Sequence, residues 1–212
     1  MEIMDLEKIR ETIETDFAAK NAAREKALVH SRKTIQLSGN AIRSIHRGEI
    51  DKAKDLIAQA SKQLSEANGV LKNFAGIYHA GFMQNAEKEY VEAESTLALV
   101  TGKPFPEPDS LGVGYAQYLN GIGEAIGELR RHILDLIRHA QLEQADRLLD
   151  LADDIFYLMA SFDYPDAITY SLRRTQDVAR SIMEKTRGDL TTAIRQKSLK
   201  ESIVSLQKKL ES

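Results

Sequence analysis

Apolar residues recur with helical spacing along almost the whole of this 212-residue chain. Leu28, Ile35 and Ile42 are separated by seven residues each, and Ile9 and Ile13 precede them at an interval of four. Such intervals place apolar side chains on one face of an α-helix, whereas no segment shows the two-residue alternation of a β-strand. The pattern therefore predicts an all-α fold.

Glycine, proline and capping residues divide this pattern into about seven helices. Three of the four prolines lie between residues 104 and 108, so no helix is expected to run through the loop at 102–110. Asp5 and Gly48 are expected to delimit the first helix, and Arg187-Gly188-Asp189 to separate the last two. We expect a single-domain bundle over residues 1–212. Its predicted helices span about 5–47, 50–73, 76–100, 112–139, 142–161, 164–186 and 189–211, the last being amphipathic.

Composition excludes several classes of site. The chain has no cysteine, which removes disulfides, thiolate metal sites and cysteine nucleophiles. No apolar stretch approaches the roughly 18 residues needed to cross a bilayer. Glu2, Asp5 and Glu7 stand where a secretory signal would carry a basic region. These features predict a cytoplasmic protein.

The net charge of −3 conceals a strong asymmetry. Residues 20–54 carry nine lysines and arginines against three acidic residues, whereas residues 124–154 carry eight acidic residues against four arginines. A basic element beside an acidic one suits a nuclease, which needs cations to hold phosphates and carboxylates to hold a metal. Charged surfaces are common on helices, so the asymmetry alone also fits a solvated surface.

Two pairs of glutamates remain after the common site motifs are excluded. The chain has no GxxxxGK[ST] or HExxH motif, and no histidine has the Glu-x-x-His spacing of di-iron bundles. Glu89 and Glu92 are three residues apart in one predicted helix, and Glu124 and Glu128 are four apart in another. Each pair projects from one helix face. The pairs fit either a solvated surface or a site for a hard cation such as Mg²⁺.

Glycines beside the second pair favour a covered surface. Gly121, Gly123 and Gly127 lie within a predicted helix, where each costs about 1 kcal/mol relative to alanine. Gly123 and Gly127 flank the glutamates and would allow another backbone to approach that side closely. The glutamate face is therefore expected to contact a neighbouring helix.

Several short motifs occur in an order and at spacings that identify a family. Glu89-Tyr90-Val91-Glu92-Ala93 is similar to an EYVEA segment, and Tyr118-Leu119-Asn120-Gly121-Ile122 followed by Gly127-Glu128-Leu129-Arg130 is similar to YL-x-G…GEL-x-R. Ser31-Arg32 and Ile45-His46-Arg47-Gly48 match in the first helix. Together these segments resemble the family of translin and translin-associated protein X (Trax).

This resemblance implies an all-α subunit of a closed oligomer that binds single-stranded RNA or DNA. Trax-type subunits are Mg²⁺-dependent endoribonucleases, with Mn²⁺ as a possible substitute, whereas translin-type subunits bind without cleaving. Glu89, Glu92, Glu124 and Glu128 match the Trax acidic set and are the expected metal ligands and catalytic residues. Glu124 departs from the family pattern, which has aspartate there. We therefore favour a Trax-like endoribonuclease, with a non-catalytic translin-like single-strand binder as the alternative.

Basic side chains near these motifs are the candidates for phosphate contacts. Arg32 and Arg43 are eleven residues apart, about three helical turns, and therefore share a face of the first helix. The expected nucleic-acid-binding residues are Arg32, Arg43, Arg47, His79, Arg130 and Arg131.

Assembly is the last expectation. The final amphipathic helix and the Gly123/Gly127 face both offer contact surfaces, and a chain with complementary surfaces usually forms a closed homo-oligomer. With the resemblance, this predicts a hexamer to octamer whose acidic sites face an enclosed cavity. Such enclosure would restrict cleavage to flexible single strands.

Overall fold

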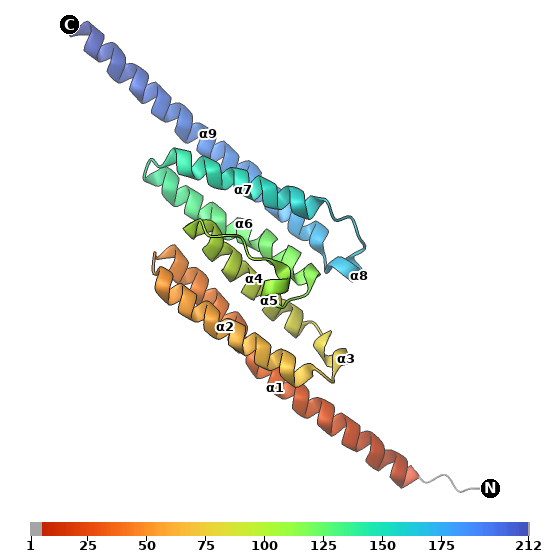
Figure 1. The fold of residues 1–212 in the computed structure, drawn as a ribbon. Helices are drawn as coiled ribbons and strands as arrows, with labels where there is room; N and C mark the ends of the chain where they lie inside the picture. Colours follow the sequence, from red (N-terminus) through yellow and green to blue (C-terminus); the bar gives the residue numbers. More distant parts are fainter. Residues whose placement is uncertain (1–5, 212) are drawn as a thin grey trace.

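The computed structural model describes residues 6–211, which form helices joined by short loops (Figure 1). Six helices are long, and three have a single turn of four residues. Within this range no strand occurs, so the predicted all-α fold is confirmed. The helices are α1 (Leu6–His46), α2 (Ile50–Leu71), α3 (Ala75–Tyr78), α4 (Phe82–Thr101), α5 (Pro108–Leu111), α6 (Tyr115–Arg138), α7 (Leu142–Ala160), α8 (Asp166–Thr169) and α9 (Leu172–Leu210).

Helices α4 and α6 form the centre of the bundle (Figure 1). Helices α1 and α2 pack against each other and against α4, on one side of this central pair. Helices α7 and α9 pack against each other and against α6, on the other side. Because α4 and α6 are in direct contact, residues that face each other between them are held by both halves of the bundle.

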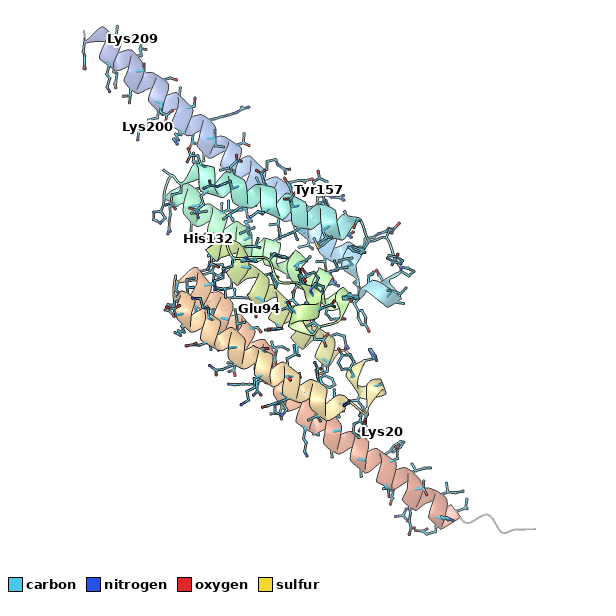
Figure 2. The ribbon with its side chains drawn as sticks, viewed as in Figure 1. Lys20, Glu94, His132, Tyr157, Lys200 and Lys209 are labelled. Carbon is cyan, nitrogen blue, oxygen red and sulfur yellow. The ribbon has the colours of Figure 1, made fainter. Side chains whose placement is uncertain are left out.

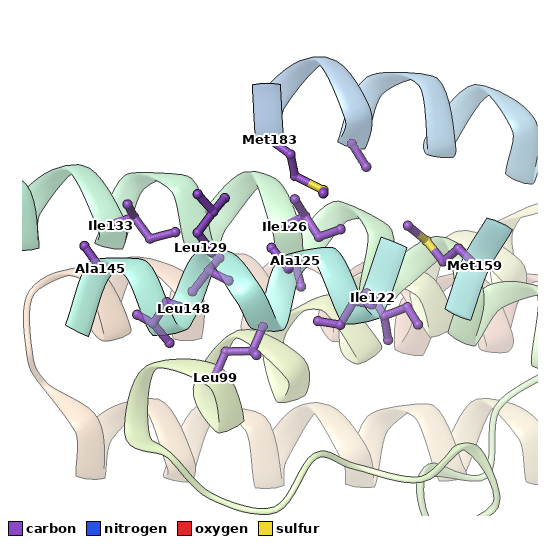
Figure 3. Close-up of a cluster of buried hydrophobic side chains, with 14 of the residues drawn as sticks. Leu99, Ile122, Ala125, Ile126, Leu129, Ile133, Ala145, Leu148, Met159 and Met183 are labelled. Carbon is purple, nitrogen blue, oxygen red and sulfur yellow. The ribbon is translucent and has the colours of Figure 1, made fainter. Parts of the chain in front are cut away.

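A hydrophobic cluster fixes the rotation of α6. Ile122, Ile126, Leu129 and Ile133 are each at most 2% exposed and pack with side chains of α7 and α9 (Figure 3). Burying one such side chain contributes about 1.5–3 kcal/mol. Since this stripe is committed to the core, the edge of α6 that carries its glutamates turns towards α4 and α1.

A second cluster joins α1, α2 and α4. Alanines at seven-residue intervals on α2, Ala53, Ala60 and Ala67, are fully buried. Such small side chains allow the backbones of α1 and α2 to approach closely. This packing anchors the C-terminal half of α1, which ends beside α6.

The predicted break at residues 187–189 is wrong, because α9 continues through Gly188. Buried Met183, Thr186 and Leu190 maintain the helical spacing across this glycine. Their packing outweighs the cost of about 1 kcal/mol for a glycine inside a helix. The helices expected at 164–186 and 189–211 therefore form one helix over most of their length.

Other boundaries differ by smaller amounts. The helix expected from about residue 76 starts at Phe82, after Gly81 with a φ of 95°. The helix expected from about residue 164 begins as the single turn α8 and is interrupted at Tyr170 and Ser171 before α9. Asp5, the expected start of the first helix, lies outside the described residues.

Both long terminal helices extend beyond the bundle in opposite directions (Figure 1). Every residue in 6–22 of α1, the N-terminal arm, and in 194–211 of α9, the C-terminal arm, is exposed. Figure 2 shows Lys20 on the first and Lys200 and Lys209 on the second. In the described part of the chain, none of the helices combines the length and the apolar character needed to span a membrane.

Candidate metal centre and nucleic-acid interface

Helices α4 and α6 approach each other closely at Gly121. A Cβ atom added to Gly121 would lie 2.6 Å from Val91 Cβ and 2.7 Å from the Lys88 carbonyl oxygen. Real Cβ atoms do not come so close, so a larger residue would separate the two helices. Gly123 is also crowded, by Thr175 of α9 and Met159 of α7, whereas Gly127 makes only an ordinary contact with Ile182. The crowding expected on this side of the helix therefore comes from other helices of the same chain.

This close contact brings three of the four predicted glutamates together. Carboxylate oxygens of Glu89, Glu92 and Glu124 lie within 4.8 Å of one another, and all three residues are partly buried. Glu89 and Glu92 come from α4, and Glu124 comes from α6. Two helices therefore build one acidic cluster from residues more than 30 positions apart.

Burial and nearby carboxylates raise the pKa values of two of these glutamates, Glu89 and Glu92. Burial is the main cause that raises the pKa of Glu92 to about 8, and the charges of Glu124, Glu89 and Glu128 add to it. Burial also raises the pKa of Glu89, with a further contribution from Glu124. The ammonium of Lys88 opposes both shifts. Burial and the neighbouring carboxylates therefore both disfavour the charged forms of Glu89 and Glu92.

Two residues that sequence reasoning did not single out contact the acidic residues of the site. Lys88 Nζ donates a hydrogen bond of 2.7 Å to Glu124 Oε1. His46 Nε2 lies 2.5 Å from Glu128 Oε2, and its side chain is only 3% exposed. Both contacts join different helices, so residue spacing within one helix could not reveal them. The only signal in the sequence was that His46 belongs to the matched Ile45–Gly48 segment.

Glu128 therefore differs from the other three predicted ligands. Its hydrogen bond with His46 is the main cause that lowers its pKa, and Arg131 contributes. The carboxylate of Glu128 lies outside the group of three described above. It is close enough to raise the pKa of Glu92, and it links α6 to the end of α1.

The chemistry of the donors fits a hard divalent cation. Three carboxylates supply oxygen ligands of the type that Mg²⁺ and Mn²⁺ prefer. Like charges so close together are stabilised when a cation shares them, and their repulsion adds to the burial that raises the pKa of Glu92. The residues present therefore fit a divalent metal ion.

The predicted phosphate-binding residues fall into two groups. Arg32 and Arg43 are exposed on α1, Arg47 is exposed just after it, and His79 is exposed just after α3. Arg130 is engaged within the fold, since its guanidinium donates to Thr186 Oγ1 at 2.9 Å and to Asp189 Oδ2 at 2.8 Å.

Arg131 lies in a basic cavity next to the acidic cluster. It is exposed and lines a cavity of about 580 Å³ together with His46, Arg130 and Arg138. His46 also contacts Glu128, so this cavity adjoins the acidic residues directly.

Comparisons with known proteins found similar sequences and similar solved structures. No protein-family model matches the chain. Uncharacterized protein MJ0175 of Methanocaldococcus jannaschii is 30% identical over 193 residues, covering 90% of this chain and 85% of that protein. Solved structures of AfC3PO and of an AfC3PO–duplex RNA complex are 31% and 30% identical, with TM-scores of 0.78 and 0.76. Each covers 90% of this chain and, respectively, 97% and 96% of the AfC3PO chain. Apo-NeC3PO has a TM-score of 0.77 at 19% identity, covering 91% of this chain and 99% of its own, and supports the fold.

The fold and the site define an all-α bundle protein with a carboxylate cluster between its two central helices. At 30–31% identity over nearly the whole AfC3PO chain, this protein belongs to the C3PO family of translin/Trax-type proteins, as its motifs indicate.

Proposed function

We propose that this chain is a Trax-like, Mg²⁺-dependent endoribonuclease that cleaves single-stranded RNA. The observation that carries the proposal is the meeting of Glu89, Glu92 and Glu124 within 4.8 Å. Three partly buried carboxylates repel a phosphate ligand unless a cation is present, so they are not expected on a surface that only binds phosphates. The complex of AfC3PO with duplex RNA supports RNA as the ligand class.

In this proposal Glu89, Glu92 and Glu124 hold the metal ion. Bound there, Mg²⁺ would stabilise the negative charge that develops on the phosphodiester and lower the pKa of a water molecule. Hydrolysis adds the oxygen of that water to phosphorus and breaks one bridging P–O bond. Glu128, oriented by His46, is the predicted fourth acid of the site and can accept a proton from water.

Cations around the cluster would position the RNA backbone. Lys88 lies at the cluster, where its ammonium can turn from Glu124 towards a phosphate. Arg131 and the basic cavity adjoin the other end of the site. We propose more distant phosphate contacts by Arg32, Arg43, Arg47 and His79. Arg130 would contact a phosphate only after it breaks its hydrogen bonds to Thr186 and Asp189. Single-stranded DNA would bind through the same phosphate contacts.

Cleavage of a labelled, unstructured RNA tests this function. We expect cleavage with Mg²⁺ or Mn²⁺, none with EDTA, and a loss of at least 100-fold in Glu89→Gln and Glu124→Gln. Glu94→Gln is the matched control, because Glu94 (labelled in Figure 2) lies on α4 but accepts a hydrogen bond of 3.0 Å from Tyr90 Oη instead of joining the cluster. A duplex of the same sequence, the ligand form seen with AfC3PO, is compared in parallel. Metal-independent cleavage, or full activity in both variants, contradicts the proposal.

One observation favours the alternative of a non-catalytic, translin-like binder. Lys88 already pairs with Glu124 at 2.7 Å, which neutralises one of the three carboxylates without a metal ion. Glu124 also replaces the family aspartate and has a longer side chain. Binding of RNA that persists in EDTA, with no cleavage in Mg²⁺ or Mn²⁺, would establish this alternative.

We further propose that the chain assembles into a closed homo-oligomer, from hexamer to octamer. The C-terminal arm exposes Leu199, Ile203, Leu206 and Leu210 at the three- and four-residue spacing of a helix-pairing seam. The N-terminal arm exposes Leu6, Ile9, Ile13 and Phe17. Such stripes gain stability from burial against another chain. Light scattering is expected to give the mass of six to eight chains, and an active monomer or dimer would exclude an enclosed site.

A further inference from the structure

A second cavity, of about 640 Å³, adjoins the acidic cluster. Residues of α4, α6 and α9 line it, and Lys88, Glu92 and Glu124 are among them. The volume falls within the range of about 300–1,000 Å³ that is typical of small-molecule sites. A group bound there would lie directly beside the carboxylates.

Unpaired amide groups line this cavity. Gln117 lines it, its Oε1 lies beside Gly114 at the start of α6, and its amide makes no hydrogen bond to another residue in the range 6–211. Asn85 also lines it, is exposed, and likewise makes no side-chain hydrogen bond to a described residue. Both amides are therefore available to a ligand with complementary hydrogen-bonding groups.

The other two amide side chains that line the cavity, in contrast to those of Asn85 and Gln117, make hydrogen bonds within the fold. Gln84 Oε1 accepts a hydrogen bond from Gly81 N, and its Nε2 donates to the Tyr78 carbonyl oxygen. Asn120 Nδ2 donates to the Thr169 carbonyl oxygen at 2.9 Å, and Asn120 Oδ1 accepts from Thr175 Oγ1 at 2.6 Å. Asn120 thus ties the junction of α8 and α9 to α6.

That junction forms the opposite wall. Tyr170 and Ser171 have φ values of 51° and 67°, which non-glycine residues rarely adopt, and Asn120 bonds on either side of them hold this conformation. Tyr170 lines the cavity and is 45% exposed, so part of its ring is free to contact a ligand. Arg174 lines it too, is exposed, and pairs with no acidic residue of the described chain.

We propose that this cavity binds the nucleotide next to the scissile phosphate and selects its base. Asn85 and Gln117 contact the base edge, Tyr170 stacks on the base, and Arg174 contacts the adjoining phosphate. A carboxamide offers a donor and an acceptor side by side, which can form two hydrogen bonds to one base edge. Aromatic stacking with hydrogen bonds to base edges is the usual way that proteins recognise single-stranded RNA. The placement of this nucleotide beside the scissile phosphate rests on the proposed function, whereas the binding of a nucleotide in the cavity does not.

Binding of the four nucleoside 5′-monophosphates in EDTA tests the cavity without activity. For the wild type, we expect the preferred nucleotide to bind about tenfold more tightly than the weakest. Asn85→Ala/Gln117→Leu is expected to lose this discrimination, whereas Gln144→Ala, at an exposed residue of α7, retains it. Equal binding of all four nucleotides, or unchanged discrimination in the double variant, overturns the proposal. If the double variant does not fold, Asn85→Ala alone, which alters only an exposed side chain, decides the question by the same criterion.

Sequencing of cleavage products from a random RNA pool gives the second measurement. We expect a base preference at one position beside the cut in the wild type and at least a fivefold weaker preference in the double variant. Cleavage without any base preference overturns the cavity proposal and leaves the nuclease intact. Absence of metal-dependent cleavage removes the nuclease, whereas selective nucleotide binding in EDTA would still support the cavity.

Discussion

Replacing Gly121 with alanine is expected to separate α4 from α6 and so damage the acidic cluster without changing any carboxylate. The added methyl group would meet Val91 at 2.6 Å and the Lys88 carbonyl oxygen at 2.7 Å, and the second is backbone that cannot rotate away. Overpacking of this kind costs about 1–3 kcal/mol. Alanine recovers about 1 kcal/mol of helix propensity. The net effect is a destabilisation of up to about 2 kcal/mol, with α4 shifted at Lys88, next to Glu89.

Gly188→Ala is the matched control for this prediction. Gly188 is also inside a helix, but nothing lies within 4 Å of an added Cβ atom. Only the propensity gain remains, so this variant is expected to be more stable by about 1 kcal/mol. Thermal unfolding in EDTA should therefore lower the Tm of Gly121→Ala and raise that of Gly188→Ala, each by roughly 2–4 °C per kcal/mol. Mn²⁺ affinity should fall in the first variant alone. If both variants gain stability equally, α4 and α6 are not in the close contact described.

Three further predictions concern the cluster, the basic cavity and the arms. Glu92→Gln in EDTA should stabilise the protein by about 2–5 kcal/mol at pH 8.5 and hardly at pH 4, measured by urea unfolding. The sign follows because the pKa of Glu92 is about 8 in the folded protein and near 4.5 in the unfolded chain, so wild-type stability falls as pH rises between these values. A difference in stability between the two proteins that does not change with pH would refute this prediction. Arg131→Ala should weaken RNA binding for all sequences and reduce its salt dependence, whereas unchanged affinity and slope would exclude a phosphate contact. Ile203→Asn/Leu206→Asn should lower the mass of the assembly in light scattering without unfolding α1–α7, and an unchanged mass would exclude the C-terminal arm from the interface.

Local patterns predicted most of the helices but not the places where tertiary packing overrides propensity. Gly188 was expected to end a helix, because glycine is the strongest local signal in that segment. Met183, Thr186 and Leu190 supply a buried stripe that continues across it. Conversely, Tyr170 and Ser171 interrupt the helix although neither is glycine or proline. Their conformation depends on Asn120, some 50 residues earlier in the chain, so no local pattern reports it.

The acidic cluster was predictable as a set of residues but not as a geometry. The spacing of Glu89 and Glu92 placed them on one helix face, and the glycines of α6 indicated a close neighbour. Only the structure brings Glu124 to them and pairs Glu128 with His46, which lies 82 residues away. Lys88 was hidden for the same reason, since its partner is on another helix. Contacts between helices depend on packing angles that one-dimensional periodicity does not contain.

Direct titration with Mn²⁺ at pH 8, with binding measured by electron paramagnetic resonance, tests the metal centre itself. We expect binding in the wild type that weakens at least tenfold in Glu92→Gln and in Glu124→Gln, each of which removes one charged ligand of the cluster. Glu94→Gln, on the same helix but outside the cluster, should bind as the wild type does. Equal Mn²⁺ affinity in all four proteins would contradict a metal centre formed by Glu89, Glu92 and Glu124.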